Sequence, residues 1–154
     1  MENSIEKKDS NISVYEKLVS VIEIDNIYVK KLTMESIIPF HDIDDIIESD
    51  KKLSIDIDNI FSLEKKLSNY KFQANGKINV SAKAEENLIF IINMELIAEY
   101  DISKYDGDIS DEVYNLFVKN NVPINIWPYA REIVQSSTTR MGYPSLIIKP
   151  YRRF

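Results

Sequence analysis

Residues 70–83 alternate between two kinds of side chain without a break. Every second residue from Tyr70 to Ala82 is apolar or glycine, and every residue between them is polar. Successive side chains of a β-strand point to opposite faces of a sheet, whereas an α-helix repeats about every 3.6 residues. A helix would therefore mix the two kinds on every face. The run predicts a long strand with one buried face and one wet face.

Three further segments alternate in a similar way and predict partners for this strand in one antiparallel sheet. The first of them changes parity between Ile24 and Ile27, which indicates a bulge near Asp25-Asn26 or a strand that is partly covered on both faces. The turn Ala84–Asn87 joins the long strand to the last one as a hairpin. The predicted ranges of the other three strands are 21–35, 53–58 and 88–99.

In the last third of the chain the apolar period becomes that of a helix. Asp108 or Ser110 is placed to cap a first helix that ends before Pro123. A second helix is predicted to begin at Pro128 and to stop before Gly142. Proline suits the first turn of a helix because its missing N–H would have no partner there. The predicted buried faces are Ile109, Val113, Leu116 and Phe117, then Ala130, Ile133, Val134, Ser137 and Met141, with Arg131, Glu132, Gln135 and Thr138 opposite.

These patterns predict an α+β fold: a four-stranded antiparallel sheet followed by two helices packed on one face. Residues 1–20 are expected to form an N-terminal segment that is at most partly ordered, because they lack a clear helix cap. Residues 21–154 are expected to form a single domain. The acidic stretch 37–52 is expected to be a crossover loop with a short helical turn. Three apolar residues of the N-terminal segment would share one helical face: Val14, Leu18 and Val21.

Composition excludes several classes of protein. The net charge is −6 over 154 residues, which disfavours a broad attraction to nucleic acid or anionic lipid. No apolar run approaches the roughly 20 residues that a membrane span needs. Met1–Asn11 has no apolar core of the kind that signal peptides carry, so the cytosol is the expected compartment. The absence of cysteine removes disulfides, thiolate metal sites and cysteine nucleophiles.

Residues with catalytic chemistry are sparse. His41 is the only histidine, and no second histidine or any cysteine is present to complete a metal site with it. The carboxylates of residues 42–50 lack the glycine turn and ligand spacing of a calcium loop. Three glycines in the whole chain cannot build a glycine-rich phosphate cradle. We therefore expect no enzyme, no cofactor and no metal, with an enzyme as the third choice among function classes.

Apolar surface is more abundant than a small core requires. Residues 88–96 are apolar on one parity throughout and largely apolar on the other. A central strand buried on both faces accounts for part of this pattern. Two helices cover only one face of a four-stranded sheet, however, and soluble monomers seldom expose large apolar patches. Self-association or ligand binding is expected to cover the rest.

The C-terminal third carries a specific motif. Residues 127–132 read Trp-Pro-Tyr-Ala-Arg-Glu, and Arg140, Tyr143-Pro144, Leu146 and Pro150 follow. This run resembles the second-helix signature of the SecB family, in which an aromatic-Pro-Tyr-Ala-Arg-Glu run precedes Arg, Phe-Pro and Leu-x-Leu-x-Pro. A weaker resemblance extends the match to about residues 22–150. The signature residues, to which we assign a structural role, are Trp127, Pro128, Tyr129, Arg131 and Glu132.

The resemblance implies a homotetramer, built as a dimer of dimers, that holds non-native polypeptides in extended form without ATP or a cofactor. It also implies the residues that line the client-binding groove. By position, these are Leu53, Ile55 and Ile57, then Phe90, Ile92 and Met94, and finally Tyr143 and Ile148. All are apolar here, as such a groove requires. The alternative interpretation is that several of them are ordinary core residues.

The family's export members contact the SecA motor through acidic positions on the sheet. The corresponding positions here are Lys31, Glu35, Ile91 and Asn93, which have lost much of that acidic character. SecA remains a candidate partner, but the loss of acidic residues at these positions argues against it. Some SecB-like proteins instead protect one antitoxin, so a dedicated client is the other option. The rival from a different class is a structural or regulatory homo-oligomer without chaperone activity.

Overall fold

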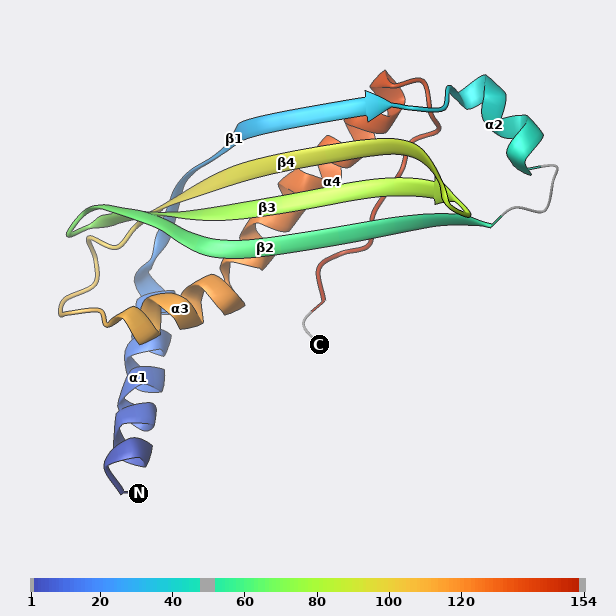
Figure 1. Cartoon of the computed structure of the whole chain (residues 1–154). Helices are drawn as coiled ribbons and strands as arrows, with labels where there is room; N and C mark the ends of the chain where they lie inside the picture. The colour runs from blue at the N-terminus through green and yellow to red at the C-terminus, as the bar shows by residue number, and fades with distance from the viewer. Residues whose placement is uncertain (1, 48–51, 153–154) are drawn as a thin grey trace.

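The computed structural model describes residues 2–47 and 52–152 of the chain. Its centre is a four-stranded antiparallel sheet in the order β1-β4-β3-β2, with the helices α3 and α4 following it along the chain (Figure 1). The predicted fold class is confirmed. The strands are β1 (Glu23–Ser36), β2 (Leu53–Ser68), β3 (Lys71–Ala84) and β4 (Asn87–Asp101), and the helices are α1 (Glu2–Val21), α2 (Phe40–Ile47), α3 (Asp111–Asn120) and α4 (Val122–Arg140).

The long alternating run forms β3, which pairs with β2 on one side and β4 on the other. Its apolar side chains are buried on the face that α4 covers, which we call the inner face. The opposite face of the sheet is the outer face. The predicted bulge in β1 is also confirmed, because the register with β4 shifts between Ile24 and Asn26. A second shift separates Val29 from Lys31.

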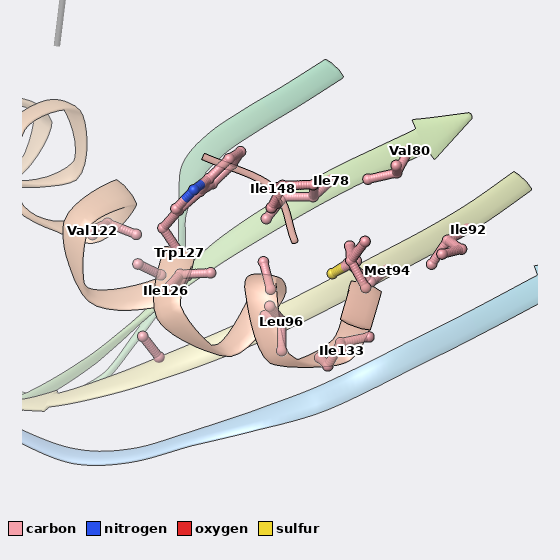
Figure 2. Close-up of a cluster of buried hydrophobic side chains, with 14 of the residues drawn as sticks. Ile78, Val80, Ile92, Met94, Leu96, Val122, Ile126, Trp127, Ile133 and Ile148 are labelled. Carbon is pink, nitrogen blue, oxygen red and sulfur yellow. The ribbon is translucent and has the colours of Figure 1, made fainter. Parts of the chain in front are cut away.

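Helix α4 packs against β3 and β4 and builds the main apolar core with them (Figure 2). Gly76 is needed where α4 and β2 approach β3 most closely. A Cβ atom at this position would lie 3.0 Å from the Phe61 ring and 3.1 Å from Cδ1 of Ile126. The absence of a side chain therefore lets the Phe61 ring and α4 meet over the strand.

An aromatic cluster fills the core under α3. The rings of Phe72 and Tyr100 stack at 5.1 Å, and Phe117 of α3 stands edge-on to both. Burial raises the pKa of Tyr100 to about 12, and its hydroxyl accepts a hydrogen bond from Nδ2 of Asn125 at 2.9 Å. Of the two predicted caps for α3, Ser110 is the one used: its side chain accepts from the backbone N–H of Val113.

Helix α4 corrects two details of the sequence analysis. It begins at Val122 instead of Pro128, so Pro128 lies inside the helix and Pro123 occupies the first turn. Pro128 is exposed, and a proline is tolerated better on the solvent side of a helix, where water can solvate the carbonyl that loses its partner. Thr138 is fully buried instead of facing solvent, because its hydroxyl donates within the helix to the carbonyl of Val134.

The N-terminal residues form helix α1, where the sequence analysis expected a segment that is at most partly ordered. Leu18 is fully buried, and Val14 packs against the core. The hydroxyl of Tyr15 donates to Oδ1 of Asn121 at 2.6 Å, and α1 packs along α3. The short helical turn expected in the crossover is α2, whose Ile43 is buried.

Candidate binding groove

Residues 143–152, the C-terminal segment, leave the end of α4 and cross the inner face of the sheet without regular secondary structure (Figure 1). Two side chains of α4 hold its backbone. Nε1 of Trp127 donates to the carbonyl of Lys149 at 2.7 Å, and Nε of Arg131 donates to the carbonyl of Ile148 at 2.9 Å. Both are signature residues, and they attach the C-terminal segment to α4. The other signature residues, Pro128, Tyr129 and Glu132, are exposed.

Tyr143 anchors the start of the C-terminal segment. Its ring lies against Phe90 of β4 at 5.1 Å, and the side chain is buried. The hydroxyl lies 2.6 Å from both Oγ of Ser36 and the carbonyl of Ile38. It is also 3.2 Å from the carbonyl of Ile89. This one hydroxyl therefore joins the end of β1 and the start of β4 to the C-terminal segment.

A groove of about 470 Å³ lies between the inner face of β2 and the C-terminal segment, and we call it the β2 groove. Most of its lining side chains are apolar, and Trp127 of α4 contributes one wall. Tyr151 continues that wall, with its ring 5.4 Å from Trp127 and 6.1 Å from Phe61. The lining residues are Ile55, Ile57 and Asn59 of β2, Trp127 of α4, and residues 146–152.

The predicted client-contact residues fall into two groups. Ile55, Ile57 and Ile148 line the β2 groove, and exposed Leu53 continues the same face of β2. The others are buried in the core: Phe90, Ile92 and Met94 of β4, and Tyr143. Figure 2 shows Met94 beside the part of α4 that carries Ile133, with Ile92 further along β4, and all three belong to the buried apolar core.

Eight of the eleven lining residues were not predicted as contacts, among them Trp127, Ile147 and Tyr151. Trp127 was assigned only a structural role, but it also lines the groove. Ile147 is 63% exposed, although it stands between Leu146 and Ile148 in an apolar run. An apolar residue that stays exposed cannot be told from its buried neighbours by sequence period when the segment is neither helix nor strand.

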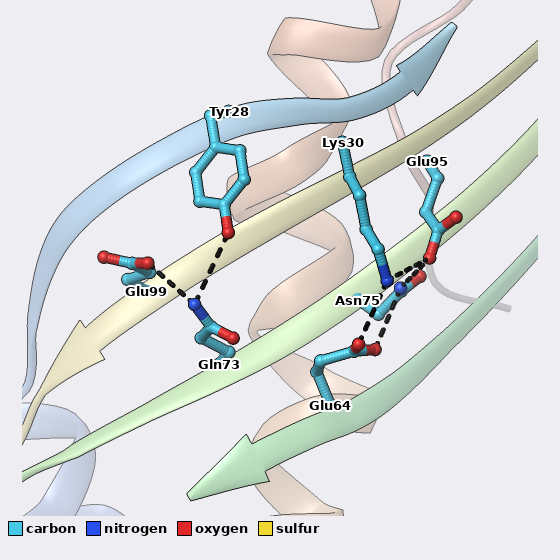
Figure 3. A network of polar contacts seen from close by, with 7 residues as sticks. All are labelled: Tyr28, Lys30, Glu64, Gln73, Asn75, Glu95 and Glu99. Carbon is cyan, nitrogen blue, oxygen red and sulfur yellow. Dashed lines mark hydrogen bonds and ion pairs between the residues drawn. The ribbon is translucent and has the colours of Figure 1, made fainter. Parts of the chain in front are cut away.

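The outer face carries a polar network that spans all four strands (Figure 3). Nζ of Lys30 lies 3.2 Å from carboxylate oxygens of both Glu64 and Glu95. Nδ2 of Asn75 donates to the same two carboxylates, at 3.1 and 2.5 Å. Asn75 is only 2% exposed, and its Oδ1 has no hydrogen-bond partner among the residues that the structure describes. Gln73 is buried nearby and donates to Glu99 at 2.7 Å.

This network predicts a loss of stability in acid. Hydrogen bonds from Lys30 and Asn75 hold the pKa of Glu64 below its ordinary value of 4.5, and bonds from Asn75 and Lys30 do the same for Glu95. The folded chain therefore keeps both carboxylates ionised when the unfolded chain has begun to bind protons. The stabilisation is present above pH 4.5 and is lost as the pH falls below it.

We expect the free energy of unfolding, measured by urea titration across pH 3 to 6, to fall below about pH 4.5. The double variant Glu64→Gln, Glu95→Gln should show a shallower fall, because two of the titrating groups are gone. Equal slopes in the two proteins would contradict this role for the network.

The positions that correspond to SecA contacts also lie on the outer face. Glu35 pairs with Ile91 across the sheet, Thr33 pairs with Asn93, and Lys31 follows in the same register. A cavity of about 290 Å³ at this place is lined by Thr33, Met34, Glu35, Ile91 and Asn93. Glu35 is its one acidic residue among those described.

The structure adds two observations on metals and membranes. Within residues 2–47 and 52–152, no three His, Cys, Asp or Glu side chains are grouped in a way that would hold a metal ion. None of the helices, over the same residues, combines the length and the apolar content of a membrane span.

Comparison with known proteins agrees with the resemblance seen in the sequence. Residues 16–152 match the family model described as preprotein translocase subunit SecB. The protein-export protein SecB of Chromobacterium violaceum is 24% identical over 90% of this chain and 87% of its own length. That of Buchnera aphidicola is 27% identical over 60% of this chain, and the match spans 57% of the Buchnera protein.

One solved structure has a similar fold over most of its length. It is the SecB-like chaperone Rv1957 of Mycobacterium tuberculosis, in complex with a ChAD peptide from the Rv1956 HigA1 antitoxin. The similarity has a TM-score of 0.76 at 16% identity and covers 92% of this chain and 98% of that one.

Proposed function

This chain belongs to the SecB family, and from that premise we propose that it is an ATP-independent holding chaperone. It binds unfolded polypeptides in extended form along the β2 groove and releases them unchanged, without enzymatic activity or a cofactor. The observation that carries the proposal is the groove itself. It is an open apolar channel beside a strand at the edge of the sheet, and we expect an extended chain to enter it and a folded protein to be excluded.

The proposed site consists of side chains that touch the client and of buried side chains that support them. Leu53, Ile55 and Ile57 of β2 face Ile148 and the C-terminal segment and touch the client directly. The remaining predicted residues, which are Phe90, Ile92, Met94 and Tyr143, lie in the core and support these side chains. A buried client Leu or Phe contributes about 1.5–3 kcal/mol before ordering costs, so one groove binds weakly.

We further propose a homotetramer, built as a dimer of dimers, that repeats the groove and turns weak contacts into avidity. Exposed apolar residues outside the groove support self-association, since a soluble monomer seldom leaves such surface bare. β1 is an edge strand and exposes Ile24, Val29, Leu32 and Met34, and α4 exposes Ile124 and Tyr129. Residues 21–154 would act as one unit in this assembly, with α1 packed on α3.

The clients are either secretory precursors or one dedicated partner in the cytosol. The Mycobacterium tuberculosis chaperone, with a bound antitoxin peptide, is the precedent for a dedicated client. Curated relatives named protein-export proteins are the precedent for export. Because Glu35 is the only acidic residue among the four positions that correspond to SecA contacts, a client-dedicated role without SecA agrees better with the side chains present.

Aggregation of an unfolded model protein tests the proposal. At stoichiometric ratios of assembled chaperone, light scattering from the aggregating client should be strongly suppressed without nucleotide. Static light scattering of the chaperone alone should give about four times the 17.9 kDa chain mass. Full aggregation in the presence of correctly assembled tetramer would refute the holding function.

The rival function is a structural or regulatory homo-oligomer, which the exposed apolar side of β1 also favours. In that case assembly would bury all large apolar surfaces. A dye that fluoresces on apolar surface separates the two: the assembled chaperone should bind it at the open groove, whereas the rival should bind little.

A further inference from the structure

The rim of the β2 groove is positively charged. Two of its lining residues, Lys149 and Arg152, are cationic and exposed, and none of the described lining residues is acidic. This is unusual for a chain with 25 acidic and 19 basic residues. Residues 133–154 hold four of those basic residues and no acidic one.

No acidic side chain in the described part of the chain neutralises either rim cation by an ion pair. Most lysines on the sheet behave differently: Lys30, Lys66 and Lys71 each lie within 3.2 Å of a carboxylate oxygen. The charges of both rim cations are therefore available to a partner that enters the groove.

The acidic residues of β2 that alternate with Ile55 and Ile57 point away from the groove. Asp56 pairs with Lys83 at 3.5 Å, and Asp58 lines a cavity on the outer face. Both alternate with Ile55 and Ile57, which face the groove. The pleat of the strand thus keeps the carboxylates of β2 on one side and leaves the apolar wall beside the cationic rim.

We propose that the β2 groove selects extended segments in which apolar residues are flanked by aspartate or glutamate. This inference rests on the proposed holding function and names the class of client that the groove prefers. The apolar side chains of the segment lie against Ile55, Ile57 and the Trp127–Tyr151 wall. Its carboxylates meet Lys149 and Arg152 at the rim, where the exposed charges add selectivity more than affinity.

A peptide fits these features better than a nucleic acid does. Two cations at a groove rim supply little of the phosphate neutralisation that nucleic acid binding requires, and the net charge of −6 opposes it. The lining is also mostly aliphatic, with isoleucine and leucine side chains that match those of a peptide.

Three labelled peptides test the preference. They share one apolar pattern and carry Glu, Gln or Lys at the flanking positions. With the full-length protein at low salt, fluorescence anisotropy should give binding of the Glu peptide about 3- to 10-fold tighter than the Gln peptide, and the Lys peptide should be weakest. Raising the salt concentration should shrink these differences.

Reversing the charge of the rim tests whether Lys149 and Arg152 cause the preference. The double variant Lys149→Glu, Arg152→Glu should reverse the order, binding the Lys peptide more tightly than the Gln peptide and the Glu peptide most weakly. A matched control, Lys65→Glu with Lys119→Glu, makes the same change in net charge at exposed positions outside the groove and should keep the wild-type order.

The outcomes separate the inference from the function beneath it. Equal binding of all three peptides would overturn the selectivity and leave the holding function intact. No binding of any peptide would overturn both. A single-stranded oligonucleotide should compete poorly with the labelled Glu peptide. If it competes as effectively as unlabelled Glu peptide, the rim binds polyanions in general, and the peptide assignment is overturned.

Discussion

Replacing Ile55 by aspartate is expected to weaken client holding at least tenfold while the chain stays folded. Ile55 is 42% exposed and lines the β2 groove, so the fold depends little on it. A client side chain that packs there contributes about 1.5–3 kcal/mol, and about 1.4 kcal/mol is a tenfold change in affinity. A carboxylate in the wall removes that contact and places a charge against the apolar side chains of the client.

The matched control is Ile60→Asp, which makes the same substitution on the same strand. Ile60 is 69% exposed and lines a second outer-face cavity with Lys77 and Asn79, on the opposite side of the sheet from the groove. Both variants should keep the wild-type circular dichroism spectrum, and only Ile55→Asp should fail to suppress client aggregation. Equal activity of the two variants would show that clients do not use the β2 groove.

Trp127→Ala is expected to lower the free energy of unfolding by about 3–5 kcal/mol, the range for removing a buried aromatic side chain. Trp127 is 6% exposed, packs against Tyr151 and donates to the carbonyl of Lys149. Its removal leaves a cavity under the C-terminal segment and one backbone carbonyl without its donor. The segment should detach, and client holding should fall with it.

Trp127→Phe isolates the hydrogen bond, since it keeps an aromatic ring and loses the N–H. We expect a smaller loss of about 1–3 kcal/mol. Urea titration followed by circular dichroism measures both variants, because Trp127 is the only tryptophan and its fluorescence disappears with it. A loss below 1 kcal/mol in Trp127→Ala would mean that the C-terminal segment is held by other contacts.

Much of the sheet was predictable because its signals are local, although β2 continues to Ser68, ten residues beyond the predicted end at Asp58. Period-two alternation in β3 and the parity change in β1 each follow from the backbone geometry of a strand, and both appear in the structure. The start of α4 was missed because Pro123 and Pro128 both suit a first turn, and only tertiary packing of Val122 and Ile126 decides between them.

Burial of polar residues on the outer face was not predictable. Asn75 and Gln73 occupy positions that alternation assigns to solvent, and they are buried because side chains from other strands converge on them. The residues predicted for the groove also differ in how far the sequence alone could place them. Ile55, Ile57 and Ile148, which the family resemblance selected, line one groove, whereas the burial of Phe90 depends on Tyr143 from far along the chain.

Site-specific cross-linking measures most directly whether an extended client lies in the β2 groove. The chain has no cysteine, so a photoreactive label attached to Ile147→Cys reports from the groove wall alone. The same label on Asn79→Cys reports from the outer face. With an unfolded client present, we predict strong cross-links from position 147 and few from position 79. Equal yields from the two positions, or a higher yield from position 79, would contradict the groove as the binding site.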